Sequence, residues 1–192
     1  MLVYFVVPKR MKNLAIFLLS LFFYSWGEPK YFPIMIASVL VDYFVGRGIE
    51  RFWSNRTACK WLLALSMAVN LGMLGFFKYT GFFVENLNAL LGLSLRAPNI
   101  TLPIGISFYT FQTMSYSIDV YRGRVKAEKN IIDFAAFVTL FPQLIAGPIV
   151  RYSDISRELK ERTIDLGQIS EGVAVFIMGL GKKVLIANNI GA

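Results

Sequence analysis

The sequence contains no histidine and a single cysteine, Cys59. Histidine is the most frequent general acid or base near neutral pH, so chemistry that depends on it cannot come from these residues. One cysteine allows no disulfide framework. Because histidine is absent and cysteine stands alone, only carboxylates remain as metal ligands, and we predict no metal site.

Charged residues are also scarce: they make up 17% of the chain, against about 25% in soluble domains. Apolar residues take their place, since 56% of the residues are hydrophobic and 15% are aromatic. Several apolar runs approach the roughly 20 residues that cross a bilayer. We therefore predict an all-α fold, a polytopic bundle of transmembrane helices that is embedded in the lipid bilayer of the cell membrane.

Positive charge is in excess, with a net charge of +8, but the basic residues cluster between the apolar runs. Loops 8–13, 47–60 and 122–130 together hold eleven Lys and Arg, whereas 27–30 and 78–102 hold three. Basic residues are enriched in the cytoplasmic loops of membrane proteins. The pattern predicts that the first three loops are cytoplasmic, and it argues against a nucleic-acid partner.

Hydrophobic segments separated by these loops are predicted to be helices. They are 11–27, 31–46, 61–77, 103–121 and a final piece at 172–190. A shorter amphipathic piece lies within 78–102. The sequence has no internal repeat and no low-complexity linker, so we predict one partial membrane domain over 1–192.

The apolar run 131–150 is interrupted by Pro142 and by the pair Gly147-Pro148. Proline removes a helical hydrogen bond, and the carbonyls that are freed must be buried in protein or line a wet cavity. A kinked helix that simply crosses is one interpretation, and a broken or re-entrant helix is the other. The part before Pro142 would rise only about 16 Å, which favours re-entry. Pro142 is the predicted structural break, and Gln143, Gly147 and Pro148 are candidates for lining a substrate pathway.

Segment 103–121 is the most polar of the predicted helices. One side carries Thr110, Thr113 and Ser117, and nearly the opposite side carries Gln112, Ser115 and Asp119. A helix with two opposed polar sides cannot have broad contact with lipid, so we place it in the centre of the bundle. Its polar groups either hydrogen-bond neighbouring helices or line a substrate cavity; for the cavity we name Gln112, Ser115 and Asp119. Asp119, near Arg122, also suits a local ion pair.

Two further polar residues lie inside predicted helices. A carboxylate at a helix centre costs about 2.5–3.5 kcal/mol on insertion scales. Asp42 lies within two turns of Arg47, so we expect it to pair with that arginine or to reach the membrane boundary. Asn70, in the middle of 61–77, is expected to form an interhelical hydrogen bond.

Several long motifs follow one another in a familiar order: FFYSWGEPKYF, GFFKYTGFFVENLNALLG, LPIGISFYTFQTMSYSIDVYRG, FPQLIAGPIVRYSDI and GLGKKVLIAN. Together they cover essentially the whole chain. In these motifs the sequence resembles the membrane-bound O-acyltransferases, most closely the branch that O-acetylates alginate. The D-alanyl transferases that act on teichoic acid are near relatives.

The resemblance implies a helix bundle around a tunnel through the membrane. It implies an acyl donor on the cytoplasmic side, either acetyl-CoA or an acylated carrier, and no bound cofactor. The acceptor would be an exported polysaccharide such as alginate, usually reached through an extracytoplasmic partner protein. The family's essential histidine lies on a later helix, so no catalytic residue is assigned here; the chain is expected to be an N-terminal part that is inactive alone.

Two alternatives stay open. One is D-alanyl transfer to teichoic acid within the same family, and the other is a transporter or channel whose broken helix lines a permeation path.

The resemblance further implies that Gln143 and the backbone around Gly147 shape the acyl pathway, with Arg151 and Tyr152 holding the break in place.

Overall fold

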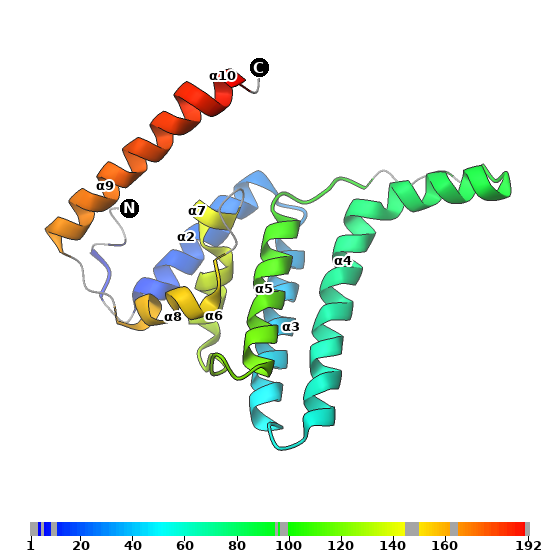
Figure 1. Ribbon diagram of the computed structural model, residues 1–192, viewed down its shortest axis with the longest axis horizontal. Coiled ribbons are helices and arrows are strands. Elements are labelled where there is room, and N and C mark those ends of the chain that lie inside the picture. The colour runs from blue at the N-terminus through cyan, green and yellow to red at the C-terminus, as the bar shows by residue number, and fades with distance from the viewer. Residues whose placement is uncertain are drawn as a thin grey trace. The chain divides into compact units, whose positions relative to one another are not determined.

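Helices make up most of the chain (Figure 1). The computed structural model describes residues 4, 6–8, 11–94, 96, 100–144, 150–161 and 165–190. In chain order the helices are α2 (Lys12–Gly27), α3 (Phe32–Arg51), α4 (Arg56–Leu91), α5 (Ile106–Tyr121), α6 (Ile131–Thr139), α7 (Phe141–Leu144), α8 (Tyr152–Lys160), α9 (Leu166–Gly181), η2 (Lys182–Ala187) and α10 (Asn188–Ile190). The described residues include no strand, so the predicted all-α class is confirmed for them.

The chain divides into two compact units, Met1–Leu159 and Lys160–Ala192. The second unit is helical through α9, η2 and α10, and η2 is a π-helical stretch between the two α-helices. The first unit holds α2 to α7 and nearly all of α8, and it contains the hydrophobic core. The single membrane domain over 1–192 stays a prediction.

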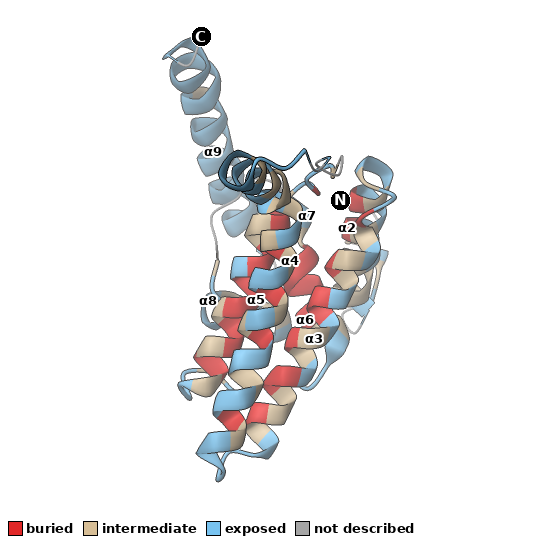
Figure 2. Ribbon diagram, turned by 90° about the vertical axis from the view of Figure 1, so that its right-hand side faces the viewer, coloured by how far each residue is buried: buried red, intermediate tan, exposed pale blue. Residues whose placement is uncertain are grey.

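Helix α5 is the central helix of the first unit. It packs against α3, α4 and α6, while α2 packs chiefly against α6. Ten of its sixteen residues are buried (Figure 2). Helices α3 and α5 run in one direction, and α4 and α6 run in the opposite one (Figure 1). The central position that the sequence predicted for segment 103–121 is therefore confirmed.

Helix α4 is longer than the sequence indicated. We predicted a helix at 61–77 and a separate amphipathic piece, but one helix of 36 residues spans both. No proline interrupts it, and it ends at Gly92, whose φ of 62° suits a glycine. The helix changes direction along its length (Figure 1). The Thr80 hydroxyl donates to the Phe76 carbonyl at 2.5 Å, a type of bond that bends helices.

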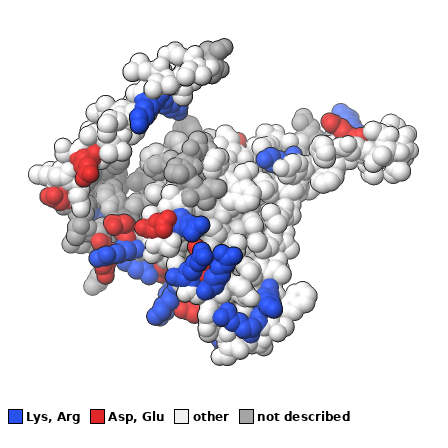
Figure 3. Space-filling model, in the orientation of Figure 1, with Lys and Arg blue, Asp and Glu red and all other residues white. Residues whose placement is uncertain are grey.

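Two helices, α3 and α4, are long and apolar enough to cross a bilayer by length and composition. Helices α2 and α5 have sixteen residues each, fewer than the roughly 20 of a typical span. The space-filling view shows charged side chains gathered toward one end of the first unit (Figure 3). The middle part of α4 shows few of them in the same view.

The close approach of α3 to α5 depends on Gly46. A Cβ at this position would lie 2.8 Å from the Tyr116 ring, which packs on Phe134 with ring centroids 4.4 Å apart. We expect Gly46→Ala to lower the free energy of unfolding by about 1–3 kcal/mol because the ring cannot retreat. Gly72→Ala, with nothing within 4 Å of the added atom, is the control and should be neutral or stabilising. Thermal unfolding in detergent measures both; equal stability of the two variants would contradict the contact.

Candidate functional site

The run 131–150 is broken inside the bundle. Helix α6 ends at Thr139, and Leu140, with φ −53° and ψ 108°, leaves the helical conformation. Helix α7 then begins at Phe141 with Pro142 as its second residue. Proline in the first turn of a helix loses nothing, since that N–H has no intrahelical partner. Continuing α6 through Pro142 would instead remove a hydrogen bond and create a clash.

The break frees backbone groups, and three neighbouring helices satisfy them. In an unbroken helix the Phe137 carbonyl would accept from the N–H of Phe141. That N–H instead donates to the Ser20 hydroxyl on α2 at 3.3 Å. The carbonyl accepts from the side-chain amides of Gln112 on α5 and Gln143 on α7, each at 3.1 Å.

We call Gln112, Gln143 and the carbonyl of Phe137 the Phe137 clamp. Two residues that the sequence singled out independently, 31 positions apart, thus meet at one atom of the break. Each amide uses one N–H to hold the freed carbonyl, so both side chains have a structural function at this site. Their predicted function in lining a substrate pathway stays a prediction.

The other two predicted pathway residues on α5, Ser115 and Asp119, have different hydrogen-bond partners. The Ser115 hydroxyl donates to the Gln112 carbonyl on its own helix at 2.8 Å. Asp119 forms an ion pair with Arg124 at 3.4 Å, rather than with the Arg122 that the sequence indicated, because the chain turns back after α5. Gly147 and Pro148 lie outside the described residues.

After the break the chain returns to the end of the bundle where α6 begins. The Tyr152 hydroxyl, at the start of α8, donates to the carboxyl of Glu128 in the α5–α6 loop. The other oxygen of Glu128 accepts from the N–H groups of Lys129 at 2.8 Å and Asn130 at 3.0 Å. At the far end of α8, the Leu159 carbonyl accepts from the Asn13 amide at 3.0 Å.

Burial and the hydrogen bond to Glu128 raise the pKa of Tyr152 well above its ordinary value. The hydroxyl therefore stays protonated and remains a donor throughout the physiological range. Because the pKa of Tyr152 is raised on folding, the contribution of its protonated hydroxyl to the free energy of unfolding is complete below about pH 10, the ordinary pKa of tyrosine. That contribution is lost only as the pH rises above this ordinary pKa.

We expect Tyr152→Phe to lower the free energy of unfolding by about 1–3 kcal/mol, because the buried Glu128 loses one of its donors. The difference from wild type should be constant between about pH 6 and pH 9. Chemical denaturation at several pH values measures it. Tyr79→Phe removes a hydroxyl from an exposed tyrosine and serves as the control. A deficit that grows toward pH 9 would contradict the protonated donor.

A second polar cluster joins α3, α4 and α5 around Asp42. The carboxyl group is completely buried. It accepts from the hydroxyls of Ser66 at 2.5 Å and Ser117 at 2.7 Å and from the Asn70 amide at 2.6 Å. The expected pairing with Arg47 is wrong: that arginine bonds Glu50 on the same helix at 3.0 Å, because Asp42 faces the opposite, buried side of α3.

Asn70 links this carboxyl group to two more hydroxyls. Its amide also donates to the Ser66 carbonyl at 3.0 Å, which fixes which end of the side chain faces Asp42. Its oxygen accepts from Ser38 at 3.0 Å and Thr113 at 3.4 Å. The interhelical hydrogen bond expected for Asn70 is confirmed. We call the carboxyl group and these five partners the Asp42 network.

The spacing of polar residues in the sequence carries a signal for the Asp42 network. Each of the three helices contributes two polar residues four positions apart, and i, i+4 residues share a helix face. The pairs are Ser38 and Asp42, Ser66 and Asn70, and Thr113 and Ser117. About one turn before Thr113 on α5, the buried hydroxyls of Tyr109 and Thr110 have no hydrogen-bond partner among the described residues.

Comparison with known proteins identifies relatives along almost the whole chain. It is 40% identical over 97% of its length to the probable alginate O-acetylase AlgI of Pseudomonas putida, and 39% identical over 97% to that of Azotobacter vinelandii. It is also 35% identical over 97% to the peptidoglycan O-acetyltransferase of Helicobacter pylori. The chain spans only 39%, 38% and 41% of these relatives' lengths. No protein-family model and no solved structure matches the chain.

These relatives are named as O-acetylating enzymes that act on alginate or on peptidoglycan. The chain belongs to the membrane-bound O-acyltransferase family, as its motifs predicted.

Proposed function

We propose that the protein is a membrane enzyme that transfers an acyl group to hydroxyls of an exported polysaccharide. The favoured acyl group is acetyl, and the favoured acceptor is alginate. The observation that carries this proposal is the identity of 39–40% over 97% of the chain to proteins named as alginate O-acetylases. Peptidoglycan is the second candidate acceptor, on the strength of the 35% identical relative from Helicobacter pylori.

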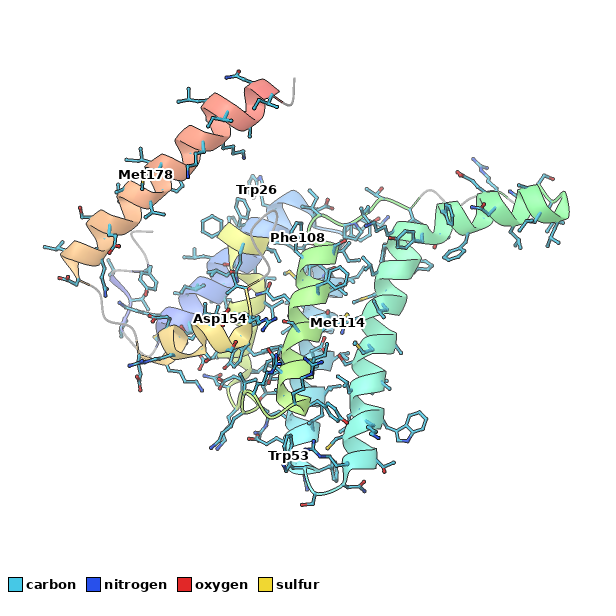
Figure 4. The ribbon with its side chains drawn as sticks, viewed as in Figure 1. Trp26, Trp53, Phe108, Met114, Asp154 and Met178 are labelled. Carbon is cyan, nitrogen blue, oxygen red and sulfur yellow. The ribbon has the colours of Figure 1, made fainter. Side chains whose placement is uncertain are left out.

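The arrangement of the loops supports a multi-pass orientation in the membrane. We call the end of the first unit that holds loops 47–60 and 122–130 the basic end, and we place this end in the cytoplasm. The Tyr43 hydroxyl of α3 donates to the Lys129 carbonyl at 2.7 Å, and Arg56 donates to the Tyr121 carbonyl at 3.3 Å. Trp53, labelled in Figure 4 at the α3–α4 turn, belongs to the same end. Two of the loops that the charge count assigned to the cytoplasm, 47–60 and 122–130, therefore lie at the same end of the first unit, as one membrane side requires.

In this orientation α6 enters from the cytoplasmic end, breaks at the Phe137 clamp and returns, which is a re-entrant path. Irregular backbone at membrane depth is tolerated where protein or a wet cavity surrounds it. We propose that this break borders the route by which the acyl group leaves its cytoplasmic donor, acetyl-CoA or an acylated carrier. An extracytoplasmic partner protein would hand the group on to the polysaccharide.

The acceptor hydroxyl must lose its proton as the ester bond forms, and the donor's thiol or alcohol leaves with a proton. These residues contain no histidine, and neither the Phe137 clamp nor the Asp42 network presents a free base. We therefore assign no base to the described residues and propose that their helices position the pathway.

The proposal is tested by expressing the protein, as its gene encodes it, in an alginate-producing bacterium that lacks its own O-acetylase. Acetyl groups per uronic acid are measured in secreted alginate, and O-acetyl groups are measured in purified peptidoglycan. Restored acetylation of alginate supports the proposal, and acetylation of peptidoglycan alone moves the acceptor to the second candidate. A membrane-located protein that acetylates neither polymer overturns it.

A further inference from the structure

One exposed stripe of α3 changes character along its length. Its residues follow one another at intervals of three and four, which keeps them on one face of a helix: Ala37, Leu40, Phe44, Arg47 and Arg51. Leu40 is 37% exposed and Phe44 63% exposed, whereas the opposite face is buried in the bundle. The stripe is thus apolar for its first three positions and cationic for the last two.

The two arginines lie in a groove at the basic end of the first unit. The groove encloses about 620 Å³ and is lined by Tyr43, Phe44, Arg47, Gly48, Glu50, Arg51 and Phe52. In the part of the chain that the structure describes, Arg47 forms one ion pair, with Glu50 three positions away, and exposed pairs of this kind contribute little free energy. Arg51 has no ion-pair partner among the described residues. Both guanidinium groups are therefore available to an anion.

The length of α3 sets the depth of these residues. Twenty residues rise about 30 Å, which matches the hydrocarbon core of a bilayer. With the basic end in the cytoplasm, Arg47 and Arg51 lie at the level of the lipid phosphates, and Leu40 and Phe44 lie one to three turns deeper, beside acyl chains. Arginine binds phosphate through paired N–H groups, which gives geometry as well as charge.

We propose that this stripe binds an anionic phospholipid of the cytoplasmic leaflet. Arg47 and Arg51 hold the phosphate, and an acyl chain lies along Phe44, Leu40 and Ala37. A soluble phosphate compound would use the arginines but leave the apolar stripe uncovered, and a second copy of this face would set two arginines against two more. The inference rests on the membrane orientation given under the proposed function.

The test counts lipid molecules that stay bound when the protein, as its gene encodes it, is released from nanodiscs into a mass spectrometer. The nanodiscs contain phosphatidylcholine with a minor fraction of phosphatidylglycerol. We expect wild type to retain phosphatidylglycerol, and R47Q/R51Q to reduce that occupancy about ten-fold, since each cation near the surface contributes. Lys60→Gln/Arg122→Gln removes the same charge from exposed positions outside the groove and should retain it.

Two further arms decide between sources of the phosphate. Phe44→Ser keeps both arginines but should also lower retention, because the acyl chain loses its contact. Excess glycerol phosphate in solution should not displace the bound lipid. Equal retention by wild type and R47Q/R51Q, or displacement by glycerol phosphate, overturns the proposal.

The inference and the proposed function fail in different ways. Extraction of the protein from membranes by alkaline carbonate would refute the membrane orientation itself. A protein that resists extraction and acetylates alginate, but retains phosphatidylglycerol no better than R47Q/R51Q does, refutes only the lipid site.

Discussion

Asp42→Leu is expected to lower the free energy of unfolding by about 3–5 kcal/mol, because three buried donors lose their acceptor. The substitution removes a completely buried carboxyl group that accepts three hydrogen bonds from α4 and α5. The amide of Asn70 and the hydroxyls of Ser66 and Ser117 then remain buried without their acceptor. A buried donor that loses its partner costs about 1–3 kcal/mol. The total stays below the simple sum because hydroxyls can turn toward carbonyls of their own helix.

Two companion variants separate the network from a general effect of charge. Asp42→Asn keeps the shape but turns one acceptor into a donor, which then faces another donor, and it should cost about 1–2 kcal/mol. Glu85→Gln neutralises an exposed carboxylate on α4 and should change little. Unfolding by denaturant in detergent micelles gives all three values. If Asp42→Leu is as stable as wild type, the network makes no net contribution to the free energy of unfolding.

Composition and periodicity were sufficient for the fold class and for the central position of α5. The reason is physical: a helix with polar groups on opposite sides can be placed only between other helices. The extent of α4 was not predictable in the same way. Its apolar pattern changes from all-round to amphipathic after Phe77, and that change looks like a boundary although the backbone continues without interruption.

The site was predictable in its residues but not in their partners. Pro142 marks the region of the break because proline cannot continue α6, a local rule. Gln112 and Gln143 were named separately, yet their common acceptor depends on α5 packing against α6, which the sequence does not specify. The same limit explains Asp42: Arg47 is nearer along the chain, but the two side chains point to different sides of α3.

The double variant Gln112→Leu/Gln143→Leu is expected to cost more than its two single variants together. Each single change leaves the Phe137 carbonyl with one of its two amide donors, so each should cost about 0.5–1.5 kcal/mol. The double variant leaves a buried carbonyl unpaired at the break, and about 2–4 kcal/mol is expected. Non-additivity of this sign follows because the two donors share one acceptor.

Acyl transfer should follow the same pattern if the break borders the acyl route. Single variants of the whole protein should keep transfer within about three-fold of wild type, and the double variant should lose about ten-fold or more, since ten-fold corresponds to about 1.4 kcal/mol. Gln168→Leu, an exposed position on α9, is the matched control. Additive losses in stability would refute the shared acceptor. If the double variant is destabilised but transfers acyl groups normally, the clamp stabilises the fold and has no function in the acyl pathway.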